Sequence, residues 1–284
     1  MSEIFLCSIC NVSNGGCKED CAYCTQSYKY KTGIEVFRQK PLEEIMKEAE
    51  YFADAGALGF CLVSEGRSLT SEKTEYISRA AKAIKEKFNF HLIACCGSAD
   101  KESLREIKNA GVDTYNHNLE TSRDFFPKVC TTHTWNERYE TCENAASVGL
   151  MLCVGGIMGI GESWKDREEL YKAISSLKPF TSPVNFYIPN SALPINNSVM
   201  SRNEAIECIK LAKRYLQGTR LMMAGGRETV FGSDQKEIFE AGIDAVIIGG
   251  YLNACGGDPK KDVDMIRGYG LEIATVCHQV TLIY

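Results

Sequence analysis

The sequence predicts an α/β fold, a single-domain (β/α)8 barrel of the TIM type. Eight short apolar runs alternate with stretches whose apolar residues recur at three- and four-residue spacing, which is the pattern of strands followed by amphipathic helices. The length of 284 residues accommodates one such barrel, and no Pro/Gly/Ser-rich linker divides the chain. A doubly wound open sheet is the competing arrangement of the same elements.

The elements are expected to alternate along the chain. The expected strands are 4–11, 58–64, 90–95, 112–118, 149–156, 183–189, 219–225 and 245–250. The expected helices are 41–56, 71–88, 101–110, 135–148, 164–177, 202–216, 233–242 and 260–269. Three helix-to-strand junctions end on Ala-Gly, at 54–56, 109–111 and 240–242, where glycine readily adopts the positive φ of a helix end. Their repetition fits successive units of one barrel.

Composition places the chain among globular proteins. Hydrophobic residues make up 44% and charged residues 24% of the chain, which is typical of a packed fold. A net charge of −5 and a pI near 5.6 provide no cationic field for nucleic acid or an anionic membrane. No run reaches the roughly 18 apolar residues of a membrane span. We expect neither a nucleic-acid nor a membrane partner.

The 14 cysteines of the chain need a chemical explanation. The sequence begins Met1-Ser2-Glu3 instead of with a basic and then apolar leader. We therefore expect a cytoplasmic protein, in which cysteines serve as metal ligands, reactive thiols or small buried hydrophobes and not as a disulfide framework.

Three cysteines are closely spaced after the first expected strand. Cys17, Cys21 and Cys24 form a C-x3-C-x2-C motif, and their thiolates can bind three irons of a cubane cluster that ordinarily takes four cysteines. The remaining iron would be open to a cofactor or substrate. A zinc knuckle is the alternative, but the nearest histidine is His91 and no paired cysteine spacing supports it.

This motif, with the aromatic Tyr23 before its last cysteine, resembles the signature of the radical S-adenosylmethionine family. The resemblance implies a 4Fe-4S cluster held by the three cysteines. It also implies that the open iron binds S-adenosylmethionine, which is cut reductively to methionine and a 5′-deoxyadenosyl radical. Tyr23 is then expected beside the cofactor.

A polar string, residues 115–121, ends a strand that is otherwise apolar. Buried amides and carboxylates are costly unless paired, so the string indicates a site for a polar ligand. The string resembles the YNHNLDT segment of the biotin synthase family, with Glu120 in place of the commoner Asp. The resemblance implies that Asn118 and Glu120 bind the cofactor ribose and that Asn116 and Asn118 approach the substrate. His117 is interpreted as a packed histidine.

Further blocks resemble the biotin synthase family in the same order along the chain, at 27–33, 131–138 and 153–162. The resemblance implies that Arg138 meets the cofactor carboxylate. Gly155 and Gly156 would let the backbone approach the cofactor, and Glu162 belongs to the same cofactor-binding motif. Asn185 matches a second substrate amide.

The resemblance also implies a second, 2Fe-2S cluster inside the barrel, with ligands matching Cys61, Cys95, Cys153 and Arg227. Cys96 is an alternative to Cys95 as the ligand from the third strand. An arginine inside a barrel must be fully paired, so a surface position is the alternative for Arg227. The remaining cysteines are interpreted as buried hydrophobes or strand residues: Cys7, Cys10, Cys130, Cys142, Cys208, Cys255 and Cys277.

The function implied by this resemblance is sulfur insertion into dethiobiotin, with Cys153, Arg227 and Asn118 as catalytic residues and the 2Fe-2S cluster as sulfur donor. It further implies a reductase or flavodoxin or ferredoxin as electron donor, a homodimer, and a C-terminal part at about 220–284 specific to the family. The rival functions are a hydrogenase-maturation or methylornithine-forming radical enzyme, a non-catalytic iron-sulfur electron carrier, and a zinc-stabilised module.

Overall fold

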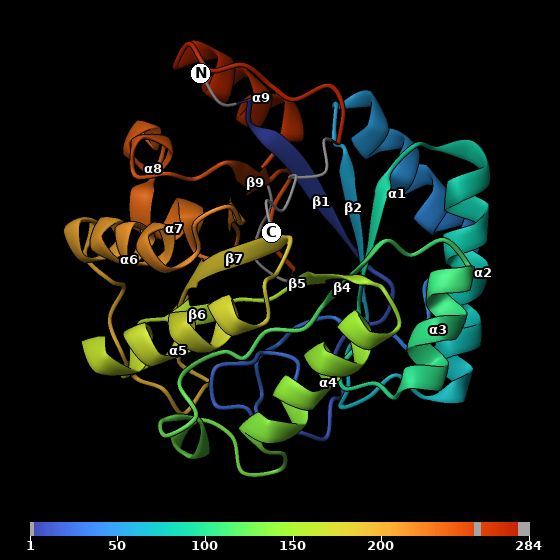
Figure 1. Cartoon of the computed structure of the whole chain (residues 1–284), viewed down its shortest axis with the longest axis horizontal. Helices are drawn as coiled ribbons and strands as arrows, with labels where there is room; N and C mark the ends of the chain where they lie inside the picture. The colour runs from blue at the N-terminus through green and yellow to red at the C-terminus, as the bar shows by residue number, and fades with distance from the viewer. Residues whose placement is uncertain (1–2, 253–256, 278–284) are drawn as a thin grey trace.

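Parallel strands pair around a closed ring in the computed structural model, which describes residues 3–252 and 257–277 (Figure 1). The first strand, β1 (Phe5–Asn11), pairs with β2 on one side and with β9 on the other, and β5 joins β7. The ring is therefore closed. The other strands are β2 (Gly59–Val63), β3 (His91–Cys95), β4 (Thr114–Asn116), β5 (Met151–Cys153), β6 (Gly156–Met158), β7 (Thr181–Phe186), β8 (Arg220–Met223) and β9 (Ala245–Ile247).

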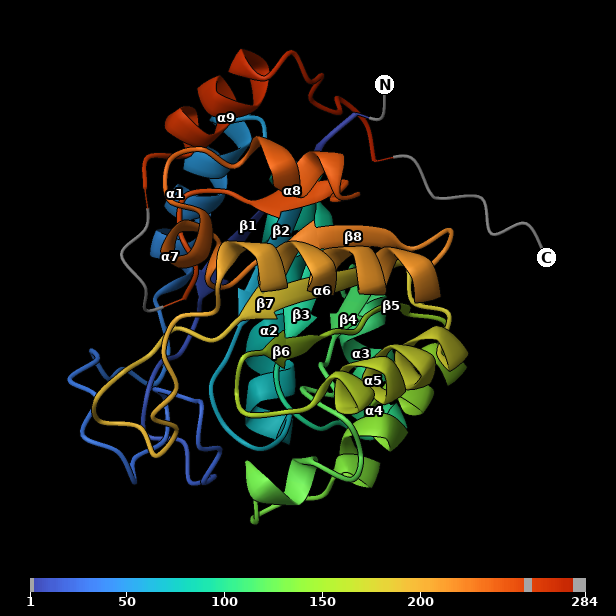
Figure 2. The ribbon, with the colours of Figure 1, turned by 90° about the vertical axis from the view of Figure 1, so that its left-hand side faces the viewer.

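Helices cover the outside of this ring on all sides (Figures 1 and 2). Several begin where a Ser, Thr or Asp side chain accepts a hydrogen bond from the first turn, as Thr70, Asp100 and Ser163 do. The helices are α1 (Leu42–Asp54), α2 (Ser71–Lys87), α3 (Lys101–Asn109), α4 (Trp135–Ser147), α5 (Trp164–Ser176), α6 (Arg202–Tyr215), α7 (Arg227–Phe231), α8 (Lys236–Glu240) and α9 (Pro259–Gly268), with a 3-10 turn at Phe126–Lys128.

Alternate residues of each strand serve two separate cores. In β1, Leu6 and Cys10 pack in the layer between strands and helices, whereas Phe5 and Cys7 pack inside the barrel. The same alternation places Cys61 inside, between the outward-facing neighbours that precede and follow it. Whether a cysteine in a strand points into the barrel or toward the helices therefore follows from its place in this alternation.

The barrel prediction is confirmed, but three elements differ from expectation. The expected strand 149–156 is split into β5 and β6, because the neighbouring Pro183 of β7 has no amide hydrogen to donate to it. The expected strand 183–189 begins at Thr181 and ends at Phe186. The short helix α7 was not expected. Cys255 lies outside the described residues.

No helix within residues 3–252 and 257–277 is both long and apolar enough to cross a membrane.

Candidate active site

The cysteine motif lies in a long loop at the C-terminal end of β1, the end of a barrel where parallel strands present site residues. In Figure 2 this blue loop and the gold segment after β7 project from the same end of the barrel. Cys21 packs there with Phe126, Tyr187 and Leu193 from two other strand-end segments. The loop is thus part of a composite site and not an isolated appendage.

Backbone hydrogen bonds within the loop hold the three cysteines on tight turns. Cys24 donates its amide to Cys21 O at 3.0 Å, and Cys17 donates to Gln26 O at 3.0 Å. Gly15 has a φ of 73° and donates to Gln26 Oε1 at 3.0 Å, which sets the entry to the loop. Burial raises the pKa of Cys24 to about 11 and raises that of Cys17. These thiols therefore release protons when they bind a metal.

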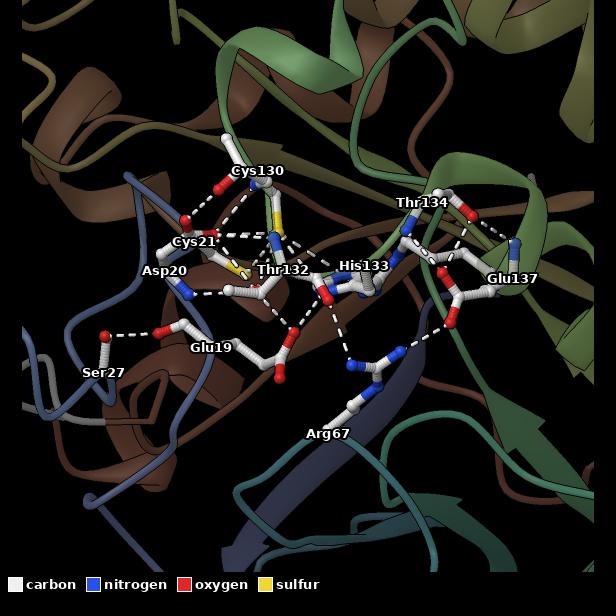
Figure 3. Close-up of polar contacts among 12 residues, drawn as sticks. Glu19, Asp20, Cys21, Ser27, Arg67, Cys130, Thr132, His133, Thr134 and Glu137 are labelled. Atoms are coloured by element: carbon white, nitrogen blue, oxygen red, sulfur yellow. Dashed lines mark hydrogen bonds and ion pairs between the residues drawn. The ribbon is translucent and has the colours of Figure 1, made fainter.

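Two acidic residues between the cysteines fasten the loop to the segment before α4 (Figure 3). Asp20 accepts hydrogen bonds from the amides of Thr131 and Thr132, at 2.9 and 3.2 Å. Glu19 accepts from Thr132 Oγ1 at 2.6 Å and contacts His133 Nδ1 at 2.5 Å. These bonds span more than 100 residues of sequence, so the cysteine loop is braced from outside itself.

Cys130 and His133 lie beside Cys21, which sequence reasoning missed. The Sγ atoms of Cys21 and Cys130 are 3.7 Å apart, and Cys130 Sγ lies 3.2 Å from His133 Nδ1 (Figure 3). Within the described part of the chain these three residues form a metal-capable trio. No spacing rule could have found it, because Cys130 is 109 residues from Cys21.

The polar string after β4 is organised by one arginine. Arg138 donates from Nε to Asn118 O at 2.6 Å and from Nη2 to Glu120 Oε1 at 2.9 Å. Glu120 has a φ of 69°, a strained conformation for a non-glycine residue and one that is concentrated at functional sites. Burial is the largest effect on this carboxyl and raises its pKa, although Arg138 opposes the shift. Glu120 Oε2 is buried without a hydrogen-bond partner within residues 3–252 and 257–277.

Gly155, between β5 and β6, and Gly156, at the start of β6, allow the backbone there to approach other protein segments. A Cβ atom on Gly155 would lie 2.1 Å from Pro183 O, and one on Gly156 would lie 2.6 Å from Glu120 O. Gly155 also donates its amide to Asn118 Oδ1 at 3.0 Å. In this structure the two glycines closely approach β7 and the polar string.

Two expected ligand-binding residues use their polar atoms within the protein. Glu162 accepts from the amides of Gly159 and Ile160 and pairs with Arg167 Nε at 2.6 Å. Asn185 donates to Gly156 O at 3.0 Å and accepts from Gly225 N at 2.9 Å. These side chains therefore shape the walls of the site by fixing adjacent backbone.

A chamber inside the barrel collects thiols and amides from separate strands. Its lining includes the side chains of Cys61, Cys95, Cys153, Asn116 and Asn118. Burial raises the pKa of Cys61, and the facing thiols of Cys95, Cys7 and Cys153 raise it further. Asn116 Oδ1 is buried there without a hydrogen-bond partner. The chamber is thus a mixed sulfur and amide site within otherwise apolar walls.

Cys96 and Arg227 lie outside the lining of this chamber. Cys96 packs in the layer between strands and helices, one residue beyond the inward-facing Cys95. Arg227 is 1% exposed at the start of α7, where it donates to Gln235 Oε1 at 2.7 Å and to Asp262 Oδ1 at 2.6 Å. In this structure the Arg227 guanidinium does not line the chamber, because it is paired with Gln235 and Asp262 beside the end of β9.

Comparison with known families decides the identity of this site. The model described as the Radical SAM superfamily matches residues 11–174, and the Biotin and Thiamin Synthesis associated domain matches residues 183–272. A biotin synthase of Wolinella succinogenes is 60% identical over 98% of this chain and 100% of its own length. The chain belongs to the biotin synthase family. A biotin synthase of Helicobacter hepaticus is 58% identical over 98% of this chain and 98% of its own length. One of Helicobacter pylori is 55% identical over 98% of this chain and 100% of its own length.

Solved structures agree with the barrel of this biotin synthase family member. A methylornithine synthase gives a TM-score of 0.78 over 96% of this chain and 84% of its own, at 16% identity. The FeFe-hydrogenase maturase HydG from Carboxydothermus hydrogenoformans gives 0.84 over 98% and 69%, at 17% identity. At these identities the likeness establishes the fold alone. The rival radical-enzyme functions are therefore not favoured over that of the 55–60% identical biotin synthases.

Proposed function

We propose that this chain inserts sulfur into dethiobiotin to form biotin, the last step of biotin biosynthesis. It is a radical S-adenosylmethionine sulfurtransferase, and the overall reaction replaces two C–H bonds of the substrate by two C–S bonds. The observation that carries the proposal is the chamber in which thiols of three strands, Cys61, Cys95 and Cys153, share one interior with two amides. The near-full-length identity to curated biotin synthases supports it.

The loop of Cys17, Cys21 and Cys24 fits a 4Fe-4S cluster with one iron open to S-adenosylmethionine. When bound, this cluster supplies the electron that cleaves the cofactor into methionine and a 5′-deoxyadenosyl radical. The role of the loop is to present three thiolates from tight turns. The hydrogen bonds that Asp20 accepts from the segment before α4 then keep those turns in place.

The polar string fits the polar part of S-adenosylmethionine. Glu120 Oε2 is buried without a partner and is assigned a ribose hydroxyl, with Asn118 beside it. Arg138 orients both through its two hydrogen bonds and is assigned the cofactor carboxylate. Tyr23, next to the last cluster cysteine, is assigned to the same cofactor. Orphaned buried polar atoms cost free energy unless a ligand completes them, which favours this assignment.

The resemblance assigns to the cofactor wall three residues, Gly155, Gly156 and Glu162, and each has a structural role in the protein. The glycines let the backbone at the start of β6 pack closely against Pro183 and the polar string. Glu162 fixes the turn that follows β6 through its bonds to two backbone amides. These residues therefore hold the shape of the wall that the cofactor would touch.

The substrate is assigned to the chamber. Asn116 and Asn118 line it and offer amide groups to the ureido ring of dethiobiotin, while the apolar walls suit its hydrocarbon part. Asn185 adjoins through its bond to Gly156. Cys61, Cys95 and Cys153 fit an iron-sulfur cluster, which when bound supplies the sulfur atom. The apolar lining excludes water from the reacting carbons.

The reducing electron is proposed to come from a reductase or from flavodoxin or ferredoxin, in the cytoplasm. The free thiols of two cluster sites support a reducing compartment. A homodimer is proposed on family resemblance alone.

The test uses anaerobically reconstituted enzyme with S-adenosylmethionine, dethiobiotin and a reductant. Wild-type protein should release 5′-deoxyadenosine and biotin. Cys153→Ser should lose biotin and the 2Fe-2S absorption while still releasing 5′-deoxyadenosine. Biotin formation by Cys153→Ser at the wild-type yield per chain would show that the sulfur donor is misplaced. If the wild-type protein cleaved S-adenosylmethionine but formed no biotin, the chain would be a radical enzyme with another substrate.

A further inference from the structure

A fourth thiol faces the chamber, from a strand that the sequence reading did not connect with the cluster. Cys7 of β1 lines the chamber together with Cys61, Cys95 and Cys153. It is 1% exposed and packs in the interior core with the other three. The facing strands therefore place four cysteines around one space.

Among the residues that the structure describes, the thiol of Cys7 on the chamber wall has no strong hydrogen-bond partner. The thiol donates a long hydrogen bond of 3.8 Å to the carbonyl of the adjacent Ser8. On the neighbouring strand, a Cβ atom at Gly59 would lie 2.8 Å from Cys7 Sγ. A side chain at Gly59 would displace the sulfur, so glycine at that position keeps the thiol where it is.

No cationic side chain lines the chamber among the residues that the structure describes. Arg227, the ligand implied by resemblance, forms ion pairs with Asp262 and Glu228 at 2.6 and 2.7 Å. On the chamber wall itself, β8 contributes the uncharged side chain of Met222. The arginine-ligated arrangement therefore does not fit this chain.

The separation of the sulfur atoms distinguishes a cluster from a single ion. Two thiolates on one zinc lie within about 4.6 Å of each other, because each Zn–S bond is about 2.3 Å. In the described chain, the trio of ligand atoms within 4.8 Å of one another is at Cys21, and no three of the chamber sulfurs meet that limit. Thiolates bound to different irons need no such contact, so the chamber suits a polynuclear cluster.

We propose that Cys7 is the fourth protein ligand of the chamber cluster, which is then held by the thiolates of Cys7, Cys61, Cys95 and Cys153. Four cysteines are an ordinary ligand set for an iron-sulfur cluster. Each thiol loses one proton to solvent as its Fe–S bond forms. Replacing an arginine by a thiolate adds negative charge to the cluster, which lowers its reduction potential relative to an arginine-ligated one. This inference rests on the proposed function, because that function requires the second cluster.

The test compares anaerobically reconstituted full-length variants by iron and sulfide content, absorption and the EPR spectrum of the reduced protein. Cys7→Ala should lose the iron and sulfide of the chamber cluster while keeping 5′-deoxyadenosine formation, which reports a folded barrel. Cys10→Ala is the matched control on the opposite face of the same strand and should keep both clusters. Arg227→Gln should retain the wild-type cluster spectrum.

Cys7→Ser provides a second reading if the alanine variant does not fold. Its alcohol replaces a thiolate, so the chamber-cluster absorption and EPR signals should shift. A Cys7→Ser spectrum identical to wild type, or loss of the chamber cluster in Arg227→Gln with retention in Cys7→Ala, would overturn the proposal and leave the proposed function standing. A wild-type protein that binds one cluster only and forms no biotin would overturn both.

Discussion

Arg138 and Glu120 form an ion pair of 2.9 Å between α4 and the end of β4, with side chains only 13% and 9% exposed. The same guanidinium holds Asn118 O, so one cation fixes the polar string from two points. Removing one member of a buried pair leaves the other charge unpaired.

Glu120→Gln should therefore lower stability by about 3 kcal/mol and weaken S-adenosylmethionine binding, since it leaves the Arg138 cation without its counter-charge. Thermal unfolding of the anaerobic holoenzyme and cofactor titration would measure these effects. Glu169→Gln, in an exposed pair with Lys172, is the control and should change stability by less than about 1 kcal/mol. Equal stability of the two variants would contradict the assigned role of the pair.

Cys21→Ala should abolish the 4Fe-4S absorption and 5′-deoxyadenosine formation, because one of three iron ligands is lost. Cys130→Ala is the matched comparison, since its sulfur lies 3.7 Å from that of Cys21 but outside the three-cysteine motif. It should keep the cluster and cofactor cleavage. If Cys130→Ala lost the cluster and Cys21→Ala retained it, the ligand assignment would be wrong.

Asn118→Ala should weaken binding of cofactor or substrate with both clusters intact. The amide of Gly155 donates to Asn118 Oδ1 at 3.0 Å, so the variant leaves a backbone donor unpaired at a cost of about 1–3 kcal/mol. Steady-state KM values for both ligands, with iron content as the control, would measure it. Unchanged KM values for both would speak against a binding role for this residue.

Cys95→Ala and Cys96→Ala form a pair of adjacent variants on opposite faces of the wall. Cys95 faces the chamber, whereas Cys96 packs in the outer layer. Cys95→Ala should lose the chamber cluster and biotin formation, and Cys96→Ala should retain both. Iron and sulfide analysis with a biotin assay separates the two, and the reverse result would transfer the ligand to Cys96.

The sequence predicted the barrel because period and alternation are local properties of the chain. Cys61, Cys95 and Cys153 could be placed in or at the end of their strands for the same reason. The break between β5 and β6 could not be anticipated from its own residues, since it depends on Pro183 in the neighbouring strand.

The sequence also could not predict which site residues lie together where their contact depends on packing between distant segments. Cys130 and His133 reach Cys21 only because Asp20 fastens two loops together. Arg227 follows a strand end and therefore looked available to the interior. The tertiary partners that hold it away, Gln235 and Asp262, become visible only in the fold.

The two faces of β1 have an evolutionary consequence. Leu6 and Cys10 pack in the layer between strands and helices, whereas Phe5 and Cys7 pack inside the barrel, where Cys7 lines the chamber. Substitutions on the outward face affect the packing of the fold, whereas substitutions on the inward face affect the chemistry of the chamber. A cluster ligand can therefore be gained or lost on an inward position without disturbing the packing of helices outside. Barrels of one ancestry can thus diverge in their interior metal chemistry while keeping the same outer architecture.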